Sequence, residues 1–251
     1  MMAEKAIAHT EKMSSLYRQE IARCIEESTI YGMEAMLPPY LPRKDMAAPT
    51  VVFANTDSVS ALFEYGAGKT AILNFASYKE PGGSFIRGGM AQEESLCHES
   101  FLYNVLRARK RSYYAWNNKH KNRSLYLDRA LFSPKIVFEH DGRRLLADVI
   151  TCAAPNYSAA KRYKLVTEEE NLLHLKSRIA FVRDIAEAEG VRTLIAGAFG
   201  CGVFGQDPKT VAKIFRETFA RTSIVKIVYA VPGSDGNAAA FEKMFSRGGK
   251  V

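Results

Sequence analysis

The sequence predicts an α/β/α sandwich with a mixed sheet, and three observations support this fold class. Segments with the apolar composition of buried strands alternate along the chain with segments of helical periodicity. The chain has 251 residues, 47% of them hydrophobic, which is enough for a substantial core. Two glycine-rich loops each follow a strand and precede a helix, so both can line one crevice at the carboxyl ends of the strands.

The first 50 residues are predicted to form a helical extension and a proline-rich connector, followed by one large domain at 51–251. A helical pattern runs from about residue 11 to 35. Its apolar positions near helical spacing are Leu16, Ile21, Ile25 and Ile30. Three prolines between residues 38 and 42 end this pattern, because proline removes a backbone donor and fixes φ.

Strands and helices are expected to alternate through the large domain. The predicted strands span 51–54, 70–75, 133–139, 148–153, 191–198 and 224–230. The predicted helices span 59–65, a segment opening at Gln92, 165–189, and a segment after Pro208. Asp141-Gly142 is typical of a hairpin turn. Asp57 is expected to cap the helix at 59–65, and a ligand contact, such as to an adenine, is the alternative for this carboxylate.

The loop after the strand at 70–75 leads directly into an acidic helix start. Four glycines fall within eight positions of this loop, namely Gly82, Gly83, Gly88 and Gly89. Glycine permits positive φ and lets the backbone approach a ligand closely. The helix then opens with Gln92, Glu93 and Glu94. Adjacent helical residues point about 100° apart, so the two glutamates are expected to have different roles, one facing the ligand and the other anchoring it.

A carboxylate in the first turn of a helix is stabilised in its charged form by the helix dipole. It can therefore act as an acid only if a bound anion favours the protonated form. The pair Glu93 and Glu94 is therefore a plausible acid or base only if the substrate itself is negatively charged. The alternative is that these are simply the acidic residues common at helix N-termini.

The second glycine-rich loop, at 199–208, reads Phe-Gly-Cys-Gly-Val-Phe-Gly-Gln-Asp-Pro. Such a loop offers backbone N–H groups and a helix N-terminus to phosphate oxygens. Its glycines also satisfy the pattern G-x-G-x-x-G of nicotinamide-binding Rossmann folds, which requires an acidic residue at the tip of the next strand. The first acidic residue is Asp235, beyond that strand, so this redox fold is disfavoured.

The net charge of +8 suits an anionic partner. A stretch from Arg107 to Arg123 carries only basic charges, with Tyr113, Tyr114 and Trp116 interleaved. Basic and aromatic residues together could hold a nucleic acid or an anionic polymer through charge and stacking. A solvated loop after a helix is the alternative.

Composition also bounds the cellular setting. No apolar run approaches the ~20 residues needed to cross a bilayer, so no membrane partner is expected. The N-terminal segment lacks a signal-peptide core, which favours an intracellular protein, cytoplasmic or nuclear. The four cysteines are widely spaced and predict reduced, mostly buried thiols rather than a zinc site or a disulfide framework.

Both glycine loops together resemble one known family. Pro81-Gly82-Gly83-Ser84, seven further residues and Gln92-Glu93-Glu94 resemble the signature of the microbial type of poly(ADP-ribose) glycohydrolase, a macrodomain family. The loop at 199–208 is similar to the second hallmark of this family, and the similarity extends from about residue 16 to 245. The resemblance implies a macrodomain-like catalytic domain at 51–251 behind an N-terminal helical extension. Ser84 departs from the pattern, because a third glycine is expected there. If that position needs positive φ or packs on the ribose, Ser84 would lower affinity or change the substrate.

The resemblance implies hydrolysis of O-glycosidic ADP-ribose linkages without a metal or cofactor. Glu94 would be the catalytic acid and then the base, Glu93 would hold the leaving ribose, and Gln92 would support the loop. The residues implied in ligand binding are Asn74, Gly82, Gly83, Ser84, Gln92, Gly200, Cys201, Gly202, Val203, Phe204 and Gly205. Two alternatives stay open: a macrodomain that binds ADP-ribose without cleaving it, and a hydrolase of nucleic-acid-linked ADP-ribose. The acceptor and the choice between chain-end and internal cleavage also stay open.

Overall fold

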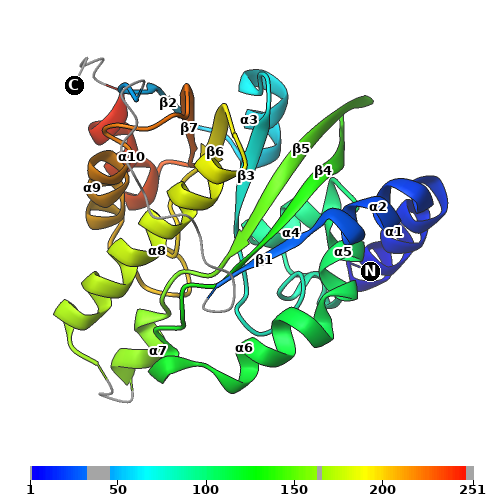
Figure 1. Ribbon diagram of the computed structural model, residues 1–251, viewed down its shortest axis with the longest axis horizontal. Helices are drawn as coiled ribbons and strands as arrows, with labels where there is room; N and C mark the ends of the chain where they lie inside the picture. The colour runs from blue at the N-terminus through cyan, green and yellow to red at the C-terminus, as the bar shows by residue number, and fades with distance from the viewer. Residues whose placement is uncertain (1, 33–45, 163–165, 247–251) are drawn as a thin grey trace.

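A mixed sheet forms the centre of the computed structural model, which describes residues 2–32, 46–162 and 166–246 (Figure 1). Its strands are β1 (Thr29–Tyr31), β2 (Thr50–Ala54), β3 (Thr70–Phe75), β4 (Ala130–His140), β5 (Arg143–Cys152), β6 (Thr193–Ala196) and β7 (Lys226–Ala230). Within the described residues the sheet has seven strands in the order β1-β4-β5-β3-β6-β7-β2. The strands from β5 to β2 run parallel, whereas β1, β4 and β5 pair antiparallel.

Helices cover both faces of this sheet (Figure 1). They are α1 (Met2–Leu16), α2 (Arg18–Glu27), α3 (Ser58–Tyr65), α4 (Gln92–His98), α5 (Leu102–Ala108), α6 (Ala115–Lys119), α7 (Tyr157–Arg162), α8 (Glu168–Ala188), α9 (Pro208–Thr218) and α10 (Gly236–Phe245). Strand β3 shows how the layers form, because successive side chains of a strand point to opposite faces. Ala71 and Leu73 join the apolar core under α8, α9 and α10, whereas Ile72 joins the core under α1 to α5. The predicted three-layer sandwich with a mixed sheet is therefore confirmed.

The N-terminal segment differs from its prediction. The single helix expected at about 11–35 is wrong, because α1 ends at Leu16, α2 ends at Glu27, and Ile30 lies in β1. Ile30 pairs with Leu131 of β4, so it serves the sheet rather than a helix face. Leu16 is 56% exposed, whereas Met13 and Tyr17 are buried against the core. The predicted proline-rich connector lies outside the described residues.

The basic stretch from Arg107 to Arg123 was interpreted either as a binding segment for an anionic polymer or as a solvated loop. The structure shows helical segments there rather than a loop. A π-helix (Lys110–Tyr114) and α6 continue the chain beyond α5. Tyr113 and Tyr114 are buried, each 1% exposed, so they cannot stack on a nucleic acid. Arg109 donates hydrogen bonds to the backbone oxygens of Ile25 and Ser28, which fastens this segment to α2.

Most other element predictions are confirmed within a few residues, and they place the loops. Asp57 caps α3 by accepting hydrogen bonds from the amides of Val59 and Ser60. Asp141 and Gly142 form the turn between β4 and β5 with positive φ at both positions. None of the helices in the described ranges is long and apolar enough to cross a membrane. Because β3 and β6 are parallel neighbours, the two glycine-rich loops leave the sheet side by side.

Candidate active site

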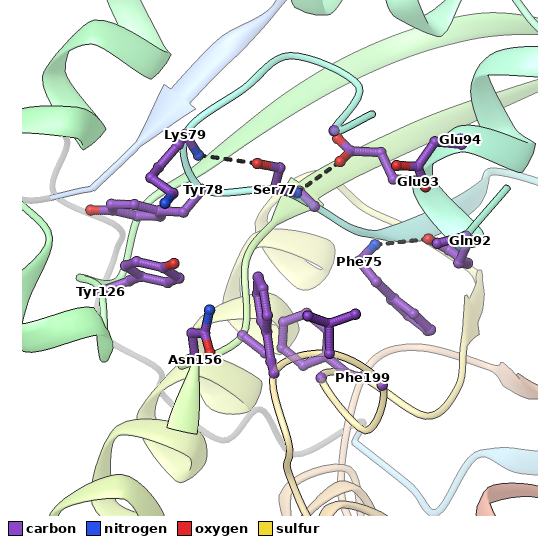
Figure 2. Close-up of a pocket in the computed structure, with 18 of the residues that line it drawn as sticks. Phe75, Ser77, Tyr78, Lys79, Gln92, Glu93, Glu94, Tyr126, Asn156 and Phe199 are labelled. Atoms are coloured by element: carbon purple, nitrogen blue, oxygen red, sulfur yellow. Dashed lines mark hydrogen bonds between the residues drawn. The ribbon is translucent and has the colours of Figure 1, made fainter. Parts of the chain in front are cut away.

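The two glycine-rich loops enclose one cavity of about 430 Å³ at the carboxyl ends of β3, β5 and β6 (Figure 2). The expected site residues that line it are Gly83, Gln92, Glu93, Glu94, Gly200, Gly202, Val203 and Phe204. The other lining residues are Phe75, Ala76, Ser77, Tyr78, Lys79, Ala91, Tyr126, Ala154, Asn156, Ala198 and Phe199. The structure thus brings together segments about 120 positions apart in sequence, as parallel neighbouring strands require.

The first loop passes directly over the two glutamates of α4. Gly83 has a φ of +59°, which favours glycine. A Cβ added there would lie 2.7 Å from Glu94 Oε1 and 3.0 Å from Glu93 Oε2. Glycine is therefore required at this position for conformation and for space, because both carboxyl groups approach the loop backbone.

Glu93 is held below the loop by backbone and side-chain donors. Its Oε2 accepts a hydrogen bond from the Ser77 amide at 2.8 Å, and its Oε1 accepts one from Asn74 Nδ2 at 3.2 Å. Glu93 is only 3% exposed. Burial, assisted by the nearby charge of Glu94, raises the pKa of Glu93 to about 8, against the opposing effect of the hydrogen bonds. At neutral pH this carboxyl group is therefore mostly protonated.

Glu94 faces the same cavity and is fixed through one oxygen. Its Oε1 accepts hydrogen bonds from the backbone amide and from the hydroxyl of Ser84, each at 2.8 Å. Glu94 is 5% exposed and lines the cavity. The neighbouring glutamates therefore have different surroundings, as their separation of about 100° around the helix predicts.

Gln92 ties the start of α4 to the sheet. Its Oε1 accepts a hydrogen bond from the Phe75 amide at 2.9 Å (Figure 2). Its Nε2 donates to the Leu73 carbonyl oxygen at 3.0 Å. The same Nε2 donates to Ser58 Oγ at 3.1 Å. Gln92 thus closes the gap between the end of β3 and the helix that carries the two glutamates.

The second loop presents backbone amides to the cavity. Gly202, Val203 and Phe204 line it, and their amides form no hydrogen bond within the described residues. Gly200 has a φ of +78°, and a Cβ there would lie 2.7 Å from the Cβ of Ala154. Free amides on a glycine loop suit phosphate oxygens.

Several expected ligand-binding residues lie behind the cavity wall rather than on it. Asn74 is fully buried and contacts Glu93 and Thr151. Gly82 packs under Tyr103, where a Cβ would lie 2.7 Å from the ring. Ser84, Cys201 and Gly205 are also not among the lining residues. The described residues contain no cluster of three or more His, Cys, Asp or Glu side chains that could hold a metal ion.

The family model described as "Microbial-type PARG, catalytic domain" matches residues 2–141, which is more than half of the 251 residues. PARG denotes poly(ADP-ribose) glycohydrolase. The chain belongs to this family. The match spans both N-terminal helices, the first glycine loop and α4. The family expected from the two loops is therefore confirmed, and with it the class of enzyme, a glycosidase.

Solved structures of poly(ADP-ribose) glycohydrolases are similar over nearly the whole chain. The enzyme from Thermomonospora curvata superposes with a TM-score of 0.85 at 28% identity, covering 97% of this chain and 99% of that one. Its complex with the inhibitor ADP-HPD has a TM-score of 0.84 at 29% identity with the same coverage. The enzyme from Deinococcus radiodurans in complex with ADP-ribose has a TM-score of 0.79 at 28% identity, covering 90% and 97%. Among curated proteins no significant match was found.

One wall of the glycohydrolase cavity was missed by sequence reasoning. Tyr78 and Tyr126 stack there with ring centroids 4.1 Å apart and an interplanar angle of 9° (Figure 2). Phe204 meets Tyr126 edge to face at 6.0 Å. Asn156, in the segment after β5, also lines the cavity. Tyr126 has a φ of +61° in an irregular turn, and no sequence pattern signals such a position.

Proposed function

We propose that this protein hydrolyses O-glycosidic linkages of ADP-ribose, in poly(ADP-ribose) or related ADP-ribosylated substrates, and releases ADP-ribose. One observation carries the proposal: the carboxyl group of Glu94 shares a cavity with the free amides of Gly202, Val203 and Phe204. A diphosphate bound to those amides would direct the attached ribose toward α4. Membership of the glycohydrolase family supports the same activity.

The reaction assigns Glu94 two consecutive roles. First its carboxyl proton passes to the leaving oxygen as the bond from the ribose C1″ to that oxygen breaks, with the electron pair staying on the oxygen. Positive charge then develops on the ribose ring, as in other glycoside hydrolyses. A water molecule forms the new bond to C1″ and gives a proton to the Glu94 carboxylate, which restores the acid. Glu93 lies beside it in the same cavity and can hold a hydroxyl of the leaving ribose.

Turnover by Glu94→Gln tests this assignment. General acid–base assistance typically contributes about 10²–10⁴-fold, so the variant should release ADP-ribose from poly(ADP-ribose) at least about 100-fold more slowly. Binding of ADP-ribose, measured by calorimetry, should stay within a few-fold of the wild-type protein. Glu242→Gln, on the exposed face of α10, is the matched control and should keep full activity. Wild-type turnover by Glu94→Gln would contradict the proposal.

The serine at position 84, where the family pattern has a third glycine, bears on the alternative of a macrodomain that binds ADP-ribose without cleaving it. Its φ is −104°, a backbone conformation that any residue adopts, so the missing glycine causes no strain. Its side chain is directed to Glu94 and is absent from the cavity lining. The substitution therefore gives no steric argument against catalysis.

We also propose that the basic stretch from Arg107 to Arg123 attracts an anionic polymer by charge alone, without aromatic stacking by Tyr113 or Tyr114. Lys110, Arg111, Lys119 and Lys121 are exposed, so they can attract a nucleic acid or an anionic polymer by charge. Arg109 does not belong to this group, because it fastens the segment to α2. Lys110→Gln with Arg111→Gln should weaken polymer binding at low salt and flatten its salt dependence. An unchanged salt slope in the double variant would remove this role.

A further inference from the structure

Ser84 is the one departure from the three-glycine pattern of the family signature, and its hydroxyl contacts the proposed catalytic carboxyl group. Ser84 donates to Glu94 Oε1 twice, from its amide and from its Oγ, both at 2.8 Å. A glycine at this position would supply only the amide. The side chain therefore adds a second donor to the same oxygen atom.

The loop leaves space for this hydroxyl at Gly89. The Gly89 amide donates to the Ser84 carbonyl oxygen at 3.0 Å, which closes the loop around the serine. A Cβ at Gly89 would lie 2.0 Å from Ser84 Oγ and 3.1 Å from Glu94 Cγ. Only glycine therefore leaves room for the serine hydroxyl beside Glu94.

The two donors make the carboxyl oxygens of Glu94 unequal. Oε1 accepts both hydrogen bonds from Ser84 and would lie 2.7 Å from a Cβ added at Gly83, whereas Oε2 accepts no hydrogen bond from the described residues. An oxygen that already accepts two hydrogen bonds is a poor site for a transferable proton. The transferable proton of Glu94 therefore belongs on Oε2.

We propose that Ser84 is a positioning residue: its hydroxyl holds Oε1 of Glu94 so that Oε2 exchanges the proton with the leaving oxygen and with water. This inference rests on the proposed glycohydrolase activity. Hydrogen bonds to charged groups are stronger than those between neutral groups, so a hydroxyl at 2.8 Å restricts the rotation of the carboxyl group. The effect on the reaction depends on how much the leaving group needs a proton.

The test compares two substrates in wild-type protein, Ser84→Ala and Ser84→Gly. Poly(ADP-ribose) has an alkoxide leaving group that must be protonated, whereas ADP-ribose carrying 4-nitrophenoxide at C1″ needs no proton. For both variants kcat on poly(ADP-ribose) should fall about tenfold. This factor corresponds to the lower end of the free energy that a hydrogen bond to a charged group contributes. KM should stay within about twofold, and kcat on the nitrophenyl substrate should fall less than about threefold. Ser246→Ala, an exposed serine after α10, is the matched control and should match wild type on both substrates.

Each outcome decides a separate claim. Equal kcat of wild type and Ser84→Gly on poly(ADP-ribose) would overturn the role of Ser84. An equal loss on both substrates, or a loss confined to KM, would show that Ser84 only supports the loop and would overturn it too. A wild-type protein that is inert on both substrates would instead overturn the proposed function, and the inference with it. Thermal unfolding of each variant confirms that the compared proteins are folded.

Discussion

Glu93 is an active-site carboxyl group whose ionisation the fold changes strongly. Burial raises its pKa to about 8, from the ordinary value of 4.5 for a glutamate side chain. Between these two pH values the folded protein holds more protons than the unfolded chain, so its stability falls as pH rises from about 5 to 8. Glu93→Gln mimics the neutral carboxyl group. Asn74 Oδ1 is buried and has no hydrogen-bond partner among the described residues, so it can turn to accept from the new amide. We predict that the stability of this variant falls much less than that of the wild type as pH rises from about 5 to 8.

The measurement is the free energy of unfolding by urea at several pH values between 5 and 9, for wild type and Glu93→Gln. The pH slope of the variant should be flatter over this range than that of the wild type. Identical slopes would mean that Glu93 is not protonated in the folded protein. Glu64→Gln, an exposed residue of α3, serves as the control for loss of a surface charge.

The sequence could not predict the role of each site residue, because these roles depend on contacts between residues that are far apart in the chain. Asn74 and Ser84, which were predicted to bind the ligand, contact Glu93 and Glu94, 19 and 10 positions away. A motif identifies which residues lie near a ligand, but not which of them reach it and which support the others. That distinction depends on side-chain directions that only the folded loop determines.

Within the second glycine-rich loop, substitution of one glycine should lower the stability of the protein, whereas substitution of another should weaken ADP-ribose binding. Gly200 has positive φ and lies against Ala154, so Gly200→Ala should lower the free energy of unfolding by about 2 kcal/mol or more. Gly202 has no protein atom within 4 Å of an added Cβ and lines the cavity. Gly202→Val should therefore fold normally but bind ADP-ribose at least about tenfold more weakly, a change of about 1.4 kcal/mol.

Thermal unfolding and ADP-ribose calorimetry on both variants separate these effects. If Gly200→Ala were as stable as wild type, the loop would not require glycine at position 200. If Gly202→Val bound ADP-ribose as tightly as wild type, the loop would not form the binding site. Gly142→Ala supplies a control for positive φ alone, since this turn glycine has nothing within 4 Å of an added Cβ and lies in the hairpin between β4 and β5.

Elements were predictable where local pattern and tertiary packing agree. Strand β3 matches its predicted bounds, 70–75, because its apolar run is buried on both faces. The prediction of a single N-terminal helix was wrong. Apolar residues at helical spacing run on through α2 into β1, although the chain forms two helices and a strand there. Tyr17 breaks the helix with φ −122° and ψ 33°, and β1 then pairs with β4, about 100 residues later in the chain. Sequence periodicity cannot reveal a pairing of that range.

At the scale of the molecule, the arrangement of the site follows from the order of the strands. The order β5-β3-β6 places three parallel strand ends side by side, and the segments after them supply Asn156, the two glutamates of α4, and the amides of Gly202, Val203 and Phe204. Parallel strands joined through helices made this convergence predictable from the two glycine loops. The stacked Tyr78 and Tyr126 were not predictable, because they belong to irregular segments without a repeating pattern.

A crystal structure of Glu94→Gln with ADP-ribose would test the central claim most directly. We expect diphosphate oxygens within hydrogen-bond distance of the amides of Gly202, Val203 and Phe204, with the distal ribose between Phe204 and α4. The side chain at position 94 should lie beside C1″. A diphosphate bound elsewhere, or a C1″ remote from position 94, would show that these two loops do not form the catalytic site.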